Sequence, residues 1–140
     1  MAEIKVVRPN ERNRDFYADI APFFMSDNVR KEMPYLRDSK DRIWYFYVEK
    51  QVLGIAAVER RAATKTLDEH VYLGSLYVLP EYRNRGVGRA LIEARMNDVP
   101  AKLDVRTVCV PELSEVYQRR GFISVFQRGK YTHMKKKGHG

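Results

Sequence analysis

Two glycines in a basic loop are the residues of this sequence best suited to chemistry. Gly86 and Gly88 are separated by one residue and follow a strand-like run of apolar residues. Glycine lets the backbone approach a ligand closely, and a helix start presents unpaired N–H groups with about half a positive charge. These features together predict a site for a pyrophosphate or a similar anion. Three arginines add positive charge around it: Arg83, Arg85 and Arg89.

Two better known phosphate loops do not fit this segment. The sequence contains no G-x-x-x-x-G-K-[ST], which excludes a P-loop nucleotide hydrolase. It also lacks G-x-G-x-x-G after the strand, which argues against a dinucleotide-binding fold. The single cysteine, Cys109, excludes a zinc site built on paired cysteines, and we expect no metal.

The segments that must position the loop alternate between strand and helix patterns. Dense β-branched and aromatic runs predict strands at residues 4–8, 42–48, 52–59, 69–78, 103–110, 122–126 and 131–134. Apolar residues at helical spacing predict helices around residues 16–24, 27–33, 86–96 and 111–119. Strands interleaved with helices indicate a mixed α/β domain.

Composition limits the class of protein. The 140 residues, with 44% hydrophobic side chains, suffice for one domain, and we expect it to span residues 1–140. One cysteine points to a reducing compartment. The N-terminus lacks the apolar core of a signal peptide, and no apolar run has the length that spans a bilayer. We therefore expect a cytoplasmic protein without a membrane partner.

The net charge of +8 is concentrated at one end of the chain. Residues 116–140 hold seven basic side chains and no acidic one, whereas the preceding residues are nearly balanced. A basic segment of this kind is typical of contacts with nucleic acid or acidic protein, and equally of a solvated surface. The aromatic residues within it, Phe122, Phe126 and Tyr131, could stack on bases, but they lie in predicted strands and are predicted to lie in the core.

The loop resembles the cofactor motif of the GNAT superfamily of N-acetyltransferases, R/Q-x-x-G-x-G/A. Here the motif reads Arg83-Asn84-Arg85-Gly86-Val87-Gly88. A second segment, Tyr117-Gln118-Arg119-Arg120-Gly121-Phe122, is similar to the superfamily's Y-x-x-x-G-F. The resemblance implies a single α/β domain with a mixed sheet of six to seven strands. That sheet would splay between its fourth and fifth strands and be flanked by about four helices.

The resemblance also implies acetyl-CoA as co-substrate and assigns residues to it. The backbone of Leu76, Tyr77 and Val78 would pair with the amides of the pantetheine arm. The pyrophosphate would lie on the loop, within this set: Arg83, Asn84, Arg85, Gly86, Val87, Gly88 and Arg89. Tyr117 would be the general acid, because a phenol with a pKa near 10 is protonated at neutral pH and can donate to a thiolate.

The general base is less clear from the sequence. Many relatives place a glutamate on the fourth strand, at the position that Tyr72 occupies here. Strand alternation puts His70 on the face of Tyr72, which makes His70 the first candidate, although a lone histidine is often only structural. Glu69 is the alternative if a bulge shifts the alternation. Ser75 and Cys109 are not expected to act as nucleophiles, since attack in the superfamily is usually direct.

The expected function is transfer of an acetyl group to a primary amine of a small molecule or protein. One alternative is a CoA-binding regulatory or interaction module without efficient turnover. Another is an acyltransferase that acts on a nucleic-acid-linked amine such as aminoacyl-tRNA, approached through the basic C-terminal segment. Homodimers are common in this fold and are left open here.

Overall fold

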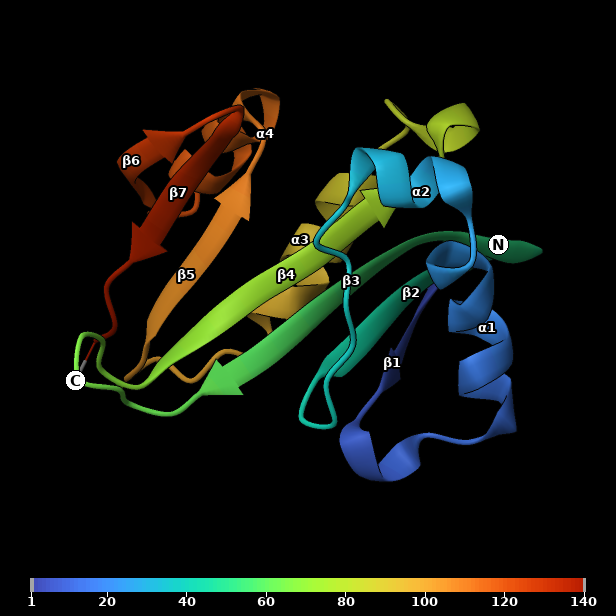
Figure 1. The fold of residues 1–140 in the computed structure, drawn as a ribbon, viewed down its shortest axis with the longest axis horizontal. Coiled ribbons are helices and arrows are strands. Elements are labelled where there is room, and N and C mark those ends of the chain that lie inside the picture. The colour runs from blue at the N-terminus through green and yellow to red at the C-terminus, as the bar shows by residue number, and fades with distance from the viewer. Residues whose placement is uncertain (1, 140) are drawn as a thin grey trace. The chain divides into compact units, whose positions relative to one another are not determined.

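The computed structural model of the protein describes residues 2–139 and contains seven strands and four α-helices (Figure 1). The strands are β1 (Glu3–Val7), β2 (Ile43–Glu49), β3 (Gln51–Arg61), β4 (His70–Val78), β5 (Asp104–Cys109), β6 (Ile123–Arg128) and β7 (Tyr131–Lys136). The helices are α1 (Arg14–Phe24), α2 (Asp27–Glu32), α3 (Val87–Met96) and α4 (Pro111–Gln118). Hydrogen bonding orders the sheet β1-β2-β3-β4-β5-β7-β6. The predicted α/β fold class is confirmed.

Contacts divide the described residues into two compact units. The first contains the chain up to Ala57 and Ser75–Asn97, and the second contains Val58–Gly74 and the chain from Asp98 onward. Strands β3 and β4 contribute residues to both units. Whether residues 1–140 act as one domain stays a prediction.

The first unit is built around aromatic side chains. Strands β1 and β2 pair antiparallel, and Trp44 and Phe46 of β2 are fully buried. Helix α1 covers them with Phe16 and Phe23, since its apolar positions recur at helical spacing. The side chain of Asn13 caps α1 by accepting a hydrogen bond from the N–H of Phe16 at 3.1 Å. The rigid base of this unit supports the loop that follows β4.

Helix α3 approaches the sheet closely because β3 carries a glycine. A Cβ at Gly54 would lie 3.0 Å from Leu91 Cδ1 and 3.1 Å from both the carbonyl oxygen of Tyr77 and Val87 Cγ1. Those distances are shorter than a normal packing contact, so Gly54 sets the spacing between α3 and β3. The start of α3 is thereby fixed against the sheet.

The second unit contains a parallel and an antiparallel pairing on either side of β5. Strand β4 pairs parallel with β5 from His70↔Asp104 to Leu73↔Thr107. Strand β5 pairs antiparallel with β7, from Val105↔Lys136 to Cys109↔Thr132. Parallel pairing aligns the first residues of β4 with the first residues of β5. Side chains from both strands therefore meet at that end.

Most predicted elements agree with the structure to within a few residues. Helix α1 continues through Pro22 to Phe24.

Phe126 was predicted to lie in the core, and this is wrong. It is 45% exposed, and every residue of β6 is exposed, because β6 is the edge strand of the sheet. Among the described residues, no helix is both long and apolar enough to cross a membrane.

Candidate functional site

The loop after β4 presents a helix start that no side chain caps. Gly86 is the N-cap residue of α3 and adopts a left-handed backbone with φ of +85°, and Asn84 is also left-handed. Among the described residues, no side-chain hydrogen bond caps the helix at Gly86. The first N–H groups of α3 are therefore donors for an external anion. This is the geometry that the glycine motif predicted.

The two motif glycines have different structural roles. At Gly86 the positive φ itself favours glycine, because an L side chain rarely adopts it. At Gly88 a Cβ would meet only Val78 Cγ2, at 3.7 Å, which is an ordinary contact. The fold thus accepts a side chain at Gly88. A need for glycine there would come from outside the chain, such as from a ligand that lies against the backbone.

Arg83 is held by the protein itself. Its Nε donates to the carbonyl oxygen of Val78 at 2.9 Å, and its Nη1 lies 3.0 Å from Glu32 Oε2. Glu32 also accepts a 2.7 Å hydrogen bond from the hydroxyl of Tyr77. Burial raises the pKa of Tyr77 most, and this hydrogen bond adds to it, so that the pKa is about 12 and the hydroxyl stays neutral. Arg83 therefore ties the loop to α2, whereas the exposed Arg85 and Arg89 are the cations beside the helix start.

Strand β4 is irregular at Ser75, just before the predicted pantetheine-binding residues Leu76, Tyr77 and Val78. Ser75 has a φ of +55°, a strained conformation for a residue with a side chain. Buried Arg42 donates from Nη1 to Ser75 Oγ at 2.7 Å and to the carbonyl oxygen of Arg37 at 2.8 Å. No local pattern indicates this contact, because Arg42 and Ser75 are far apart in the chain.

Tyr117 is a buried residue of α4 and belongs to the second unit. It is 1% exposed and packs edge-on against Phe122, with ring centroids 5.3 Å apart. The N–H of Phe122 also donates to the carbonyl oxygen of Tyr117. The Y-x-x-x-G-F segment therefore forms one packed turn at the end of α4. The role of Tyr117 as general acid stays a prediction.

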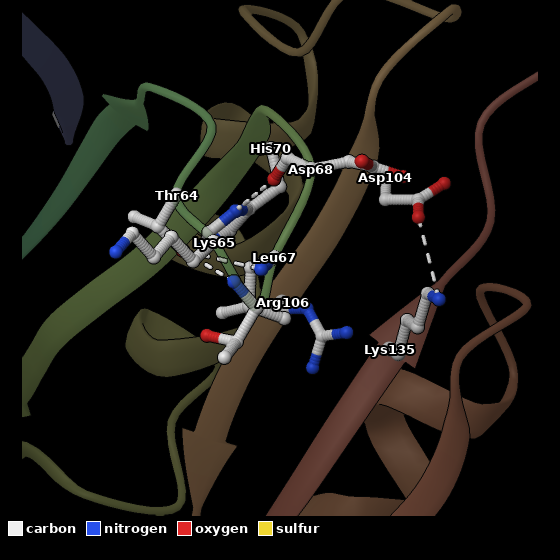
Figure 2. Close-up of a pocket in the computed structure, with 9 residues that line it drawn as sticks. Thr64, Lys65, Leu67, Asp68, His70, Asp104, Arg106 and Lys135 are labelled. Carbon is white, nitrogen blue, oxygen red and sulfur yellow. Dashed lines mark hydrogen bonds and ion pairs between the residues drawn. The ribbon is translucent and has the colours of Figure 1, made fainter.

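His70 lies at the start of β4, beside a pocket (Figure 2). It is 4% exposed, and its Nδ1 lies 2.9 Å from the carbonyl oxygen of Asp68. A carbonyl oxygen only accepts, so Nδ1 carries the hydrogen, and Nε2 of the neutral ring has a free lone pair. The geometry gives His70 the tautomer that a base needs.

Glu69 is placed differently from its neighbour. It immediately precedes β4, its side chain is 43% exposed, and its Oε2 accepts from Arg60 Nε at 2.7 Å. The pairing of β4 with β5 is regular from His70 to Leu73, and the left-handed backbone at Ser75 comes after this stretch. His70 thus remains on the face of Tyr72.

A carboxylate that the sequence analysis passed over lies near Tyr72. The guanidinium of Arg61 stacks over the Tyr72 ring at 3.9 Å, and Arg61 Nε donates to Glu59 at 2.8 Å. Glu59 is buried, with 7% of its surface exposed. Relatives are expected to carry a glutamate at the position of Tyr72. Here Arg61 links Tyr72 to a carboxylate of strand β3, a contact that no local sequence pattern indicates.

Cys109 is unsuited to nucleophilic chemistry. Burial, aided by Glu112, raises the pKa of its thiol to about 11, so the thiolate is scarce at neutral pH. Its Sγ lies 3.7 Å from Met134 Sδ, within the packed part of the second unit. Residues 2–139 contain no group of three or more His, Cys, Asp or Glu that could hold a metal ion.

Two charges of the basic C-terminal segment are paired with acidic residues that precede it. Lys135 Nζ lies 3.3 Å from Asp104, and Arg119 pairs with Glu115 at 2.7 Å. Within the segment, Arg120 donates to the carbonyl oxygen of Val116 at 3.1 Å. The segment therefore carries less uncompensated charge than its composition indicates. Contact with nucleic acid and formation of a homodimer stay predictions.

Comparison with known proteins agrees with this geometry. The family model described as "Acetyltransferase (GNAT) domain" matches residues 39–124, which is more than half of the chain. The crystal structure of Escherichia coli ElaA matches with a TM-score of 0.73 at 19% identity, over 98% of this chain and 100% of that one. An acyl-CoA N-acyltransferase from Pseudomonas aeruginosa matches with a TM-score of 0.74 at 14% identity, over 97% and 99%.

A third structure contains the ligand expected from the sequence. It is the Bacillus subtilis N-acetyltransferase YlbP in complex with coenzyme A, with a TM-score of 0.59 at 16% identity, over 98% of this chain and 97% of that one. The search of curated protein sequences found no match. The structures share the fold, and the family match covers the loop of Gly86 and Gly88 as well as Tyr117. The chain belongs to the GNAT acetyltransferase family.

Proposed function

We propose that residues 1–140 form one N-acetyltransferase domain that moves the acetyl group of acetyl-CoA to a primary amine of a small molecule or protein. The observation that carries this proposal is the uncapped start of α3 behind the left-handed Gly86. The N–H groups from Arg85 to Arg89 suit the two phosphates of CoA, and Arg85 and Arg89 complement their charge. The donor set therefore fits the co-substrate.

Acetyl-CoA would supply the activated acetyl group, and the chain would orient it. The backbone of residues 76–78 would pair with the pantetheine amides as an added strand pairs with a sheet edge. Ser75, fixed by Arg42, ends the regular part of β4 just before these residues. The strained backbone of Ser75 and its hydrogen bond to Arg42 support a role for Ser75 in positioning the thioester.

The transfer would proceed by direct attack. The amine nitrogen bonds to the thioester carbonyl carbon, the carbon–sulfur bond breaks, and the departing thiolate takes a proton from the Tyr117 hydroxyl. The nitrogen of the new amide then loses its extra proton, which restores the Tyr117 hydroxyl. A primary amine with a pKa near 10 is about 99.9% protonated at pH 7, which costs roughly 4 kcal/mol. His70 Nε2 would take that proton, because Nδ1 is already held by Asp68. Glu69 and Glu59 are the other candidate bases.

The experiment that tests this function is a thiol-release assay with acetyl-CoA and a panel of primary amines. We expect release with at least one class of amine, and a fall in kcat of about 100-fold or more in Tyr117→Phe, because a general acid contributes that much. Thermal unfolding is measured beside kcat to confirm that the variant is folded, because it keeps the ring that packs on Phe122 but loses a buried hydroxyl.

Two results would contradict the proposal. Binding of acetyl-CoA without thiol release from any amine or cell-extract protein would favour a regulatory module. Absence of acetyl-CoA binding would remove the proposal altogether. A kcat unchanged in Tyr117→Phe would remove only the assignment of the general acid.

A further inference from the structure

A polar pocket of about 300 Å³ lies in the second unit, at the start of β4 and β5. Its wall combines the connection at residues 64–68 with His70 of β4, Asp104 and Arg106 of β5, and Lys135 of β7 (Figure 2). No motif in the sequence indicated it, because its side chains come from four separate segments. It belongs neither to the loop at Gly86 nor to α3.

The wall of the pocket is held in place by its own hydrogen bonds. The N–H of Thr64 donates to the carbonyl oxygen of Leu67 at 2.7 Å, and the N–H of Leu67 donates to Thr64 Oγ1 at 3.1 Å. Asp68 accepts from His70 Nδ1 through its carbonyl oxygen. These hydrogen bonds keep the backbone of the connection in place before a ligand arrives, which reduces the entropy lost on binding.

One charged pair of the pocket is already satisfied. Asp104 accepts from the N–H of Gly138 at 2.8 Å and lies 3.3 Å from Lys135 Nζ. The hydrogen bond from Gly138, more than any other contact, holds the pKa of Asp104 below its usual value. Asp104 therefore stays ionised and is compensated by Lys135, and these two residues leave no net charge for a ligand.

Two cations in the same wall remain uncommitted. Within residues 2–139, the side chains of Lys65 and Arg106 make no hydrogen bond or ion pair. In Figure 2 the Asp104–Lys135 pair lies to the right, while the amine of Lys65, to the left, has no dashed line. Arg106 is half-buried and makes no hydrogen bond or ion pair with the described residues, although its charge also helps to lower the pKa of Asp104. Besides the Asp104–Lys135 pair, the described residues of the wall contain one carboxylate, Asp68, and two cations, Lys65 and Arg106. The wall therefore has an excess of positive charge.

We infer that this pocket binds an oxyanion, a carboxylate or phosphate, carried by the small-molecule amine that accepts the acetyl group. Arg106 would hold the oxyanion through its fork of N–H donors, and Lys65 would add a second positive charge. His70 also lines the pocket, and its Nε2 would meet the amine end of the ligand. This inference rests on the proposed function and names the substrate class for it.

The first test measures the oxyanion site without any catalysis. Inorganic phosphate and acetate are titrated in turn into the protein at constant ionic strength, and backbone amide chemical shifts of residues 64–68 are followed by NMR. We expect saturable shifts, with affinity about tenfold lower in Arg106→Gln because a charge-assisted hydrogen bond is lost. Lys65→Gln, on an exposed connection, should weaken binding too and carries no risk of misfolding.

Lys102→Gln is the matched control. It removes one cation from the same unit, close in sequence to Asp104 but outside the pocket wall. Affinity should stay at the wild-type value in this variant. If Arg106→Gln and Lys102→Gln change the shifts equally, or if the shifts do not saturate, the oxyanion site is overturned.

The second test asks whether the oxyanion belongs to the acceptor. The substrates are 6-aminohexanoate, 6-aminohexyl phosphate and 1-aminohexane, which share one chain and one type of amine but differ in the terminal charge. We expect kcat/KM to favour at least one charged amine over 1-aminohexane by about tenfold, and the ratio to fall towards one in Arg106→Gln. The two charged substrates distinguish a carboxylate from a phosphate ligand.

Failure of this inference differs from failure of the proposed function. Equal kcat/KM for all three amines would overturn the substrate class and leave the transferase intact. Saturable phosphate binding with no acetyl transfer to any amine would overturn the acceptor assignment together with the proposed function. A preference that persists in both Arg106→Gln and Lys65→Gln would also contradict the assignment.

Discussion

The loop at residues 83–89 and the pocket at the start of β4 and β5 both suit anions, but they are built differently. The loop uses backbone N–H groups from one short segment, positioned by the left-handed Gly86. The pocket uses side chains from four segments, including Lys65 and Arg106. A backbone site tolerates most substitutions except those that fill its space, whereas a side-chain site is lost with one residue. Substitutions in the loop and in the pocket should therefore have different effects.

The largest expected effect is on the proposed base. His70→Gln should lower kcat at pH 7 by about 100-fold, because a general base contributes 10² to 10⁴. Glu69→Gln should leave kcat within about twofold, since Glu69 is partly exposed and paired with Arg60. Steady-state kinetics of both variants check this. A loss in Glu69→Gln alone would reverse the assignment, and a loss in Glu59→Gln alone would move it to β3.

The glycines give the next largest effect, and substitutions at Gly54 and Gly88 should change the free energy of unfolding in opposite directions. Gly54→Ala should lower the free energy of unfolding by about 1–3 kcal/mol, because its Cβ would crowd Leu91 and the backbone of Tyr77. Gly88→Ala should raise it by about 0.5–1 kcal/mol, because alanine favours a helix and the site has room. Urea denaturation measures both. Equal destabilisation by the two changes would show that Gly88 is needed for packing.

Removing the hydroxyl of Ser75 should have a moderate effect. Ser75→Ala deletes the 2.7 Å hydrogen bond from buried Arg42, and we expect a loss of about 1–2 kcal/mol in the free energy of unfolding. Ser124→Ala, at an exposed position of β6, serves as the control. The affinity for acetyl-CoA, measured by calorimetry, should also fall if Ser75 sets the course of β4. An unchanged free energy of unfolding would mean that the hydrogen bond from Arg42 makes no net contribution to stability.

The smallest expected effect concerns Asp104 and pH. Its pKa is lowered in the folded protein, so its contribution to stability is complete above the unfolded value of about 3.9 and is lost as pH falls through the folded value. Asp104→Asn should lower the free energy of unfolding at pH 7 by about 1 kcal/mol, a small figure because the side chain is partly exposed.

The same variant should flatten the acid end of the stability profile. Chemical denaturation at a series of pH values from 7 to about 3 follows this difference between Asp104→Asn and the wild type. A constant gap between the two proteins across the whole range would contradict the role of the Asp104 carboxylate.

The sequence predicted what depends on neighbouring residues. The strand that ends at Val78, the glycine loop and the start of α3 were all found, because periodicity and glycine spacing are local signals. The sequence does not single out the cap of α1, which is Asn13. Asn10 precedes the same apolar pattern, and only the backbone decides between the two asparagines.

The parts that the sequence missed depend on which strands are neighbours. Glu59 reaches Tyr72 through Arg61, and Arg106 lies opposite Tyr72 only because β4 and β5 pair in parallel. The contact between Arg42 and Ser75 likewise joins distant segments. Phe126 followed the alternation of a buried strand, yet the edge position of β6 leaves it exposed. Strand order is not encoded in any local pattern.

The central claim is that the loop at Gly86 binds the pyrophosphate of acetyl-CoA, and calorimetric titration of acetyl-CoA tests it most directly. We predict one site per chain in the wild type, similar affinity in Gly88→Ala, and affinity about 10- to 100-fold lower in Gly88→Val, whose larger side chain would hold the phosphates away from the N–H groups. Circular dichroism should report a folded protein in each case. Acetyl-CoA binding that is absent from the wild type, or equal in the wild type and Gly88→Val, would contradict the claim.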